Sequence, residues 1–240
     1  MKLKKTAAFL AAAMILSFAA FAQDEEESTV EGEYMSSMDD IVVQELSNSD
    51  ELENKLMALQ FLEEAANNGK ISPDMMVSLD HLAGEGTNTQ SRTKGRVSNN
   101  FPEVRREACR ILGKVGTPEA AKSLNKIVKA DNEPMVLSAA INSLGEIGYN
   151  DNDETTNTIA FYSDRFETLN PTSSLALEIV NAYEKLAGNT KDKKPMLSSL
   201  QRIAVDYRLA KPVRNRAKEV LNNLRGSDSD SGKSSSKNER

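Results

Sequence analysis

Apolar residues recur at spacings of three and four along most of the chain between about residue 50 and residue 225. This is the periodicity of amphipathic helices, and no stretch of useful length alternates apolar and polar residues as a half-buried strand would. Proline or aspartate stands near the predicted helix starts and glycine near the stops, as capping chemistry favours. The pattern predicts helices over 50–67, 73–84, 102–113, 117–130, 133–146, 152–168, 173–187, 192–207 and 211–224. The fold class is therefore expected to be all-α.

An internal repeat is present in the middle of the chain, where residues 101–116 and 133–148 align without a gap. Its period of 32 residues, from Pro102 to Pro134, is typical of a helix-turn-helix repeat unit. The matched pairs are Pro102 and Pro134, Val104 and Val136, Ala108 and Ala140, Leu112 and Leu144, Gly113 and Gly145, and Gly116 and Gly148.

Each matched residue type suits a stacked helical hairpin. Proline fits the first helical turn, where its missing N–H would have no partner. The small alanine lets a neighbouring helix approach closely, and a closing glycine permits the left-handed conformation that ends a helix. Weaker copies of the pattern follow Pro73, Pro171 and Pro212. The interpretation favoured is a repeat domain over 50–225, and the alternative is a generic helical bundle with similar capping.

The best-matched copy carries a family resemblance. Residues 102–116 read PEVRREACRILGKVG, and Thr117-Pro-Glu-Ala-Ala-Lys-Ser-Leu follows. This resembles HEAT repeats of the bacterial type also found in phycobilisome lyase-like proteins, most closely over 101–148. The resemblance implies a right-handed α-solenoid of stacked antiparallel helix pairs, which such proteins use mostly for protein–protein contact and scaffolding.

The first 22 residues have the layout of a secretory signal peptide. Basic residues in Met1–Lys5 precede an uncharged, Ala-rich run from Thr6 to Ala22. The alternative, a retained membrane anchor, is disfavoured because a run of about 17 residues is short for a span. We expect cleavage after Ala22 and a periplasmic or secreted location, and no later segment is apolar enough to cross a bilayer.

Both flanks of the predicted repeat domain are polar. Residues 23–49 are rich in Asp and Glu and contain no Lys or Arg, which predicts an acidic flexible arm. Within that arm, 38–46 has enough apolar residues for one short helix or packed segment. Residues 226–240 contain no large apolar residue, so this segment is expected to be a disordered tail.

Charge and cysteine content exclude several classes of protein. The formal net charge is -6, and removal of the leader with its three lysines makes it -9, which disfavours binding to nucleic acid. The single cysteine cannot form an internal disulfide, so stability must come from packing. This composition is compatible with a bacterial periplasm, where disulfides are optional.

No catalytic, cofactor or metal motif is evident. A single histidine, His81, excludes a multi-His metal site such as those of HEAT-like hydroxylases. Cys109 has Arg105, Arg106 and Arg110 nearby, which could make it reactive, but its place beside the apolar stripe favours a buried structural role. The chain is predicted not to be an enzyme and to hold no cofactor; a lyase or hydrolase that uses carboxylates is a remote alternative.

Two basic segments are candidate binding sites. The stretch from Thr87 to Asn100 is long for a helix–helix joint and carries Arg92, Lys94 and Arg96. Residues 185–225 hold eleven basic residues against three acids, which indicates either an electropositive patch or a solvated face. The candidates there are Arg202, Arg208, Lys211, Arg214, Arg216 and Lys218. The expected partner is another protein, and the alternative is an anionic envelope component such as a lipid head group or an acidic polymer.

Overall fold

The structure of this chain is a computed structural model, which describes residues 30–87, 90, 92–93, 96–97, 99–169 and 171–235. The chain divides into two compact units, residues 1–39 and 40–240. The account below concerns the second unit. The predicted signal peptide, residues 1–22, lies outside the described residues.

The described elements are helices and one small hairpin. The longer helices are α2 (Val30–Asn48), α3 (Leu52–Asn67), α4 (Pro73–Gly84), α5 (Pro102–Val115), α6 (Pro118–Ala130), α7 (Pro134–Ile147), α8 (Glu154–Leu169), α9 (Ser173–Leu186), α10 (Lys194–Val205) and α11 (Lys211–Ser235). Two 3₁₀ turns, η1 (Asp151–Asp153) and η2 (Ala187–Asn189), and two strands, β1 (Arg92–Thr93) and β2 (Arg96–Val97), complete the set. The expected all-α class is confirmed.

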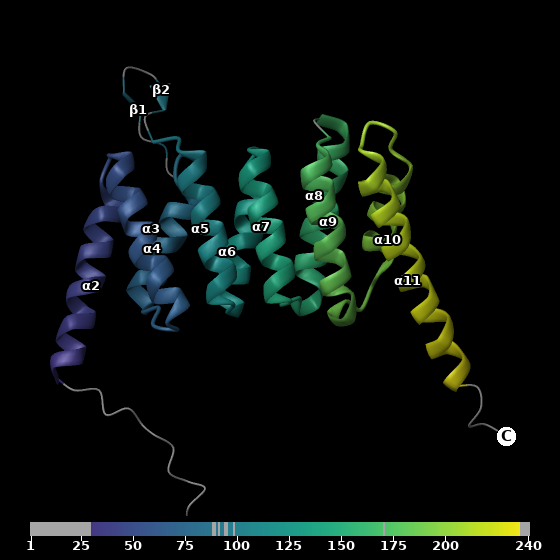
Figure 1. Ribbon diagram of the computed structural model, residues 1–240, viewed down its shortest axis with the longest axis horizontal. Coiled ribbons are helices and arrows are strands. Elements are labelled where there is room, and N and C mark those ends of the chain that lie inside the picture. The colour runs from purple at the N-terminus through teal and green to yellow at the C-terminus, as the bar shows by residue number, and fades with distance from the viewer. Residues whose placement is uncertain are drawn as a thin grey trace, which may run out of the picture. The chain divides into compact units, whose positions relative to one another are not determined.

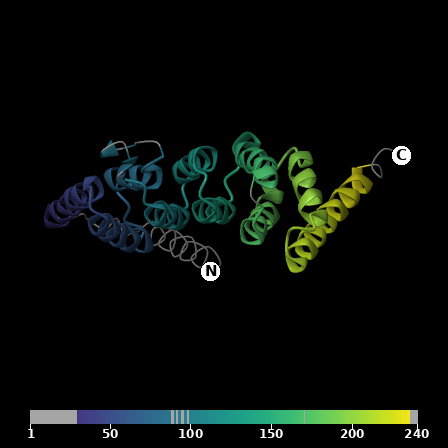
Figure 2. The ribbon, with the colours of Figure 1, turned by 90° about the horizontal axis from the view of Figure 1, so that it is seen from above.

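Within the second unit the helices stack in chain order as two rows. One row contains α3, α5, α7, α9 and α11, in which each helix packs against the next; the other contains α4, α6, α8 and α10 (Figures 1 and 2). Most helix pairs joined across the rows are neighbours in the sequence, such as α6 with α7 and α10 with α11. This is a solenoid of stacked helix pairs, as the repeat predicts.

The matched glycines of the repeat separate into two structural roles. Gly116 and Gly148 follow α5 and α7 with φ of 72° and 68°, and each donates its N–H to the leucine carbonyl four residues earlier. They are the left-handed caps that the sequence predicts. Gly113 and Gly145 lie inside the helices instead. A Cβ on Gly145 would stand 2.9 Å from Ala182 Cα, so this glycine lets α9 approach α7.

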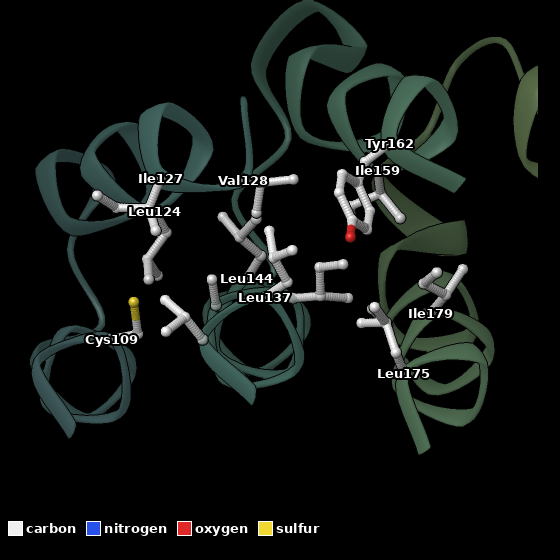
Figure 3. Close-up of a cluster of buried hydrophobic side chains, with 14 of the residues drawn as sticks. Cys109, Leu124, Ile127, Val128, Leu137, Leu144, Ile159, Tyr162, Leu175 and Ile179 are labelled. Atoms are coloured by element: carbon white, nitrogen blue, oxygen red, sulfur yellow. The ribbon is translucent and has the colours of Figure 1, made fainter. Parts of the chain in front are cut away.

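A single continuous core runs between the two rows. Its buried members extend from Val43 on α2 to Leu221 on α11. Figure 3 shows how side chains from α5 to α9, including Cys109, Leu144 and Ile179, meet in the space that the two rows enclose. Each helix pair is thus covered by its neighbours. This explains why apolar residues recur every three to four positions and form one stripe along each helix.

Three segments differ from their prediction. Within the expected flexible arm over 23–49, a helix runs from Val30 to Asn48, and it includes the segment 38–46 for which a short helix or packed segment was expected. Within the expected disordered tail over 226–240, α11 continues as far as Ser235. The pair of β1 and β2, inside the long α4–α5 connection, has no counterpart among the predicted elements.

Candidate interaction site

The α4–α5 connection carries the first group of candidate binding residues. β1 and β2 pair in antiparallel register, with Arg92 opposite Val97 and Thr93 opposite Arg96. Arg92 and Arg96 therefore belong to the two strands of one hairpin, and Lys94 lies outside the described residues. We call residues 92–97 the basic hairpin; Figure 1 shows it beyond the end of α5.

The two ends of this connection are brought together by Arg105 of α5. Its Nη1 atom donates to the carbonyl oxygen of Glu85 at 3.2 Å and to Oδ1 of Asn100 at 2.8 Å. Gly86 makes the close approach possible, because a Cβ there would lie 2.5 Å from the carbonyl oxygen of Asn99. The base of the connection is thereby closed by contacts on both sides.

A buried ion pair holds the Arg105 guanidinium in place. Its Nε atom lies 2.7 Å from Oδ2 of Asp131, and both side chains are almost completely buried. Asp131 ends α6, and its Oδ1 atom also accepts the backbone N–H groups of Asn132 and Glu133 at 2.7 and 2.9 Å. These bonds satisfy the carboxylate, which is a condition for burying a charge at tolerable cost.

A second buried ion pair extends the network toward the first helices. Nζ of Lys55 on α3 lies 2.8 Å from Oε1 of Glu85 and donates to the carbonyl oxygen of Ser47 at 3.0 Å. Glu85 thus uses its carboxylate for Lys55 and its backbone carbonyl for Arg105. We call Lys55, Glu85, Arg105 and Asp131 the charged clamp. It links α3, α5 and the joint after α6 to the segment that leads into the basic hairpin.

The second group of candidate residues, in the C-terminal repeats, is largely offset by carboxylates. Arg202 pairs with Asp164, Arg208 pairs with Asp206 at 2.7 Å, and Arg216 pairs with both Glu184 and Glu219. The bonds from Arg208 hold the pKa of the Asp206 carboxyl below its usual range. These candidate cations therefore do not form a patch of uncompensated positive charge.

The remaining candidates of this group lie on α11. Arg214 is half-buried, whereas Lys211 and Lys218 are exposed. The balance of charges over residues 185–225 did not reveal these ion pairs, because the partner carboxylates Asp164 and Glu184 lie on α8 and α9, before residue 185. In a stacked repeat, a carboxylate about 30 to 40 positions earlier lies beside the cation, so the stacking period itself is the signal that could have found these pairs.

The carboxylate of Asp153 joins two loops through hydrogen bonds to backbone N–H groups. Asp153, which has a φ of 60°, accepts the backbone N–H groups of Lys191 and Asp192 at 2.8 and 2.9 Å. These two N–H donors hold the pKa of the Asp153 carboxyl below its usual range. Asn150 donates to Thr190 Oγ1 at 3.1 Å in the same place. The α7–α8 and α9–α10 joints are thereby fixed to each other.

Cys109 and His81, the residues considered as possible reactive groups, both belong to helices of the stack. Cys109 is completely buried, and this burial strongly raises the pKa of its thiol, so it belongs to the core and is not poised as a nucleophile. His81 is half-buried near the end of α4. In the part of the chain that the structure describes, no three His, Cys, Asp or Glu side chains are grouped as a metal site would need.

Two cavities were not indicated by the sequence. One of about 470 Å³ lies between the α3–α4 and α5–α6 turns and has Ile71, Met76 and Val115 among its mainly apolar lining. Another of about 380 Å³ lies between α6 and α8 beside the exposed ring of Phe161. Phe161 lies outside the buried stripe of Ile159, Tyr162 and Phe166. This departure from the helical spacing is the sign in the sequence that its ring is exposed.

The two rows of stacked helix pairs define the described part of the second unit as an α-solenoid. Residues 90–157 match the family model described as HEAT repeats. This part of the chain accordingly carries HEAT repeats, and HEAT repeats generally mediate contacts with other proteins. The phycobilisome-lyase-like subtype stays a prediction. No curated protein and no solved structure matches the chain. No helix in the described part combines the length and apolar character that a membrane crossing needs.

Proposed function

We propose that this protein is an exported scaffold that binds another protein through the basic hairpin. The observation that carries the proposal is the charged clamp, which buries four ionised side chains at the base of an insertion outside the helical stack. Burying charges is costly compared with apolar packing. A solenoid needs no such device to join α4 to α5, since its other joints are short. The clamp is therefore best explained as a means of presenting the hairpin.

A fixed base would favour binding for an entropic reason. A loop that is ordered only on association loses conformational freedom at that moment, and this loss weakens affinity. Arg105 joins the two ends of the connection before any partner arrives. The positive charges at 92, 94 and 96 favour an acidic surface on the partner and would speed the encounter through electrostatic attraction.

The test is recovery of a partner from an envelope extract with the full chain as bait, followed by crosslinking. The hairpin variant carries Arg92→Ser, Lys94→Ser and Arg96→Ser, and its matched control carries Lys70→Ser, Lys122→Ser and Lys126→Ser at exposed positions before α4 and on α6. We expect one partner in a fixed ratio, bound by the control and lost by the hairpin variant. Recovery of no partner would contradict the scaffold proposal, and equal recovery by both variants would contradict the hairpin assignment.

Export is supported by the basic, apolar and small-residue layout of residues 1–22. N-terminal sequencing of the protein isolated from the periplasm should read from Gln23. A protein that retains Met1 and stays in the cytoplasm would contradict this part of the proposal.

An anionic envelope component, such as a lipid head group or an acidic polymer, is the second candidate ligand. It is favoured by the exposed Lys211 and Lys218 on α11 and disfavoured by the carboxylates that pair with Arg202, Arg208 and Arg216. Binding of this kind would weaken steeply with salt and respond to Lys211→Ser with Lys218→Ser. Vesicles with and without anionic lipid, sedimented with the full chain, provide the measurement.

A further inference from the structure

The first helices of the second unit leave large apolar side chains uncovered. Ile41 and Val42 on α2 and Leu56, Met57 and Phe61 on α3 are between 38% and 54% exposed. From Asp40 on, α2 and α3 lie at the N-terminal end of the stack, beyond α4 and α5 (Figure 2). We call these five residues the N-terminal apolar face.

These side chains lie on the helix surfaces that the core does not use. On α2, Val43 is completely buried, whereas its neighbours Ile41 and Val42 are exposed. On α3, the core takes Ala58, Leu59 and Leu62. At about 100° per residue, Leu56, Met57 and Phe61 fall within an arc of about 140°. The uncovered residues therefore form one side of each helix.

The opposite end of the same stack has the character that a solenoid end normally has. Repeat arrays stay soluble because their terminal helices present polar outer faces. The exposed residues of α11 follow this rule, since they include Asn215, Lys218, Glu219, Asn222 and Arg225. Val205 at the end of α10 and Tyr207 after it are also exposed at this end, but they belong to one joint, whereas the N-terminal end exposes five large apolar side chains from two helices. This larger group marks the N-terminal end as a contact surface.

The surroundings of the N-terminal apolar face are strongly acidic. Residues 40–69 contain seven Asp and Glu and one basic residue, Lys55, which is buried against Glu85. Five of these carboxylates are exposed and form no ion pair with any residue that the structure describes: Glu45, Asp50, Glu51, Glu53 and Glu64. The face thus combines apolar anchors with a rim of uncompensated negative charge.

We propose that the N-terminal apolar face binds a cationic amphipathic helix of another protein. Apolar side chains at helical spacing would pack on Ile41, Met57 and Phe61, while lysines or arginines on the flanks would meet the acidic rim. A second copy of this chain is a poorer occupant, because it would place one acidic rim against another. This surface differs from the basic hairpin in position and charge, so the inference does not rest on the proposed function.

The probe is a synthetic amphipathic helix of about five turns with leucines on one side and lysines on the other, titrated into the full chain and followed by fluorescence anisotropy. A second peptide carries glutamates in place of the lysines. The variant Met57→Ser with Phe61→Ser removes two anchors, and Val205→Ser with Tyr207→Ser removes two exposed apolar residues at the far end as the matched control. Sedimentation velocity records the oligomeric state of each protein, and circular dichroism records its helicity.

We expect the lysine peptide to bind, the glutamate peptide not to bind, and the Met57/Phe61 variant to bind at least ten-fold more weakly than the control with unchanged helicity. Equal affinity of the Met57/Phe61 variant and the control would overturn the inference, because binding would then depend on net charge and not on the apolar face. Equal affinity for both peptides would also overturn it. A dimer of the unmodified chain that the Met57/Phe61 variant abolishes would overturn it in favour of a second copy. The hairpin variant should bind the lysine peptide normally, which separates this result from that of the proposed function.

Discussion

Among the residues that the structure describes, the two halves of the stack differ in that the N-terminal half contains buried ion pairs as well as exposed ones. In the N-terminal half, Lys55, Glu85, Arg105 and Asp131 are almost completely buried and fix the ends of an inserted segment. In the C-terminal half, pairs such as Arg216 with Glu184 are exposed and join neighbouring helices at the surface. The sequence has more basic residues in the second half, yet it is the buried pairs of the first half that link α3, α5 and the joint after α6.

The difference teaches that the position of the counter-charge decides what a cation does. Exposed pairs contribute at most about 1 kcal/mol each because water screens them. A buried pair contributes little compared with apolar packing, but the loss of one partner leaves a charge stranded in the interior. A run of basic residues in the sequence is thus a weak sign of a binding patch when carboxylates lie one repeat earlier.

The largest effect is expected from Asp131→Ala, which leaves the buried guanidinium of Arg105 without its carboxylate. We expect a loss of about 3–5 kcal/mol in the free energy of unfolding, measured by urea denaturation. Because the same guanidinium closes the α4–α5 connection, limited proteolysis should cut the chain faster within residues 85–100. A loss under about 1 kcal/mol would mean that the buried pair behaves like an exposed one.

A smaller loss of stability is expected from Gly145→Ala, because α7 packs closely on α9 at this glycine, whereas α11 has open space at Gly226. Gly145→Ala places a Cβ 2.9 Å from the backbone of Ala182 on α9, whereas Gly226→Ala on α11 meets nothing within 4 Å. Overpacking costs about 1–3 kcal/mol, partly offset by the better helix propensity of alanine. Thermal unfolding should show a lower midpoint for the first variant and an equal or higher one for the second. Equal midpoints would contradict the close α7–α9 contact.

Asp153 offers a third kind of carboxylate, held mainly by backbone N–H groups. Its pKa is lowered in the folded protein, so its contribution to stability is present above the unfolded pKa and is lost as the pH falls below about 4. Asp153→Asn should reduce stability near neutral pH and flatten the acid side of the stability profile. The check is a series of urea unfolding curves between acid and neutral pH, in which parallel profiles for the two proteins would refute the assignment.

The smallest effect is expected from Glu184→Ala, which removes the exposed partner of Arg216. The unfolding free energy should change by less than about 1 kcal/mol, and the difference should shrink in high salt. The informative quantity is the ratio to the effect of Asp131→Ala. Comparable losses at the two sites would erase the contrast between the two halves of the stack.

The helical elements were largely predictable, because their signals are local. Proline at the first turn and glycine after the last placed α5 and α7 to within two residues, and the period of 32 predicted that they stack. Of the helix over Val30–Asn48, only a short helix or packed segment within 38–46 was expected, since the acidic composition around it resembles that of a flexible arm. The charged clamp was also not predicted. Lys55 and Asp131 are far apart in the sequence, and nothing local marks either as buried.

The sequence by itself determined the fold class: spacing, caps and repeat period predict stacked helix pairs. Only the tertiary structure decided which charges are free. Stacking places each helix beside one about a repeat away, so Arg202 and Arg216 pair with carboxylates of earlier helices. Glu45 and Glu53, in contrast, form no ion pair with any residue that the structure describes. The physical reason is that Coulomb attraction depends on distance in space and on exposure to water, and neither quantity is encoded locally.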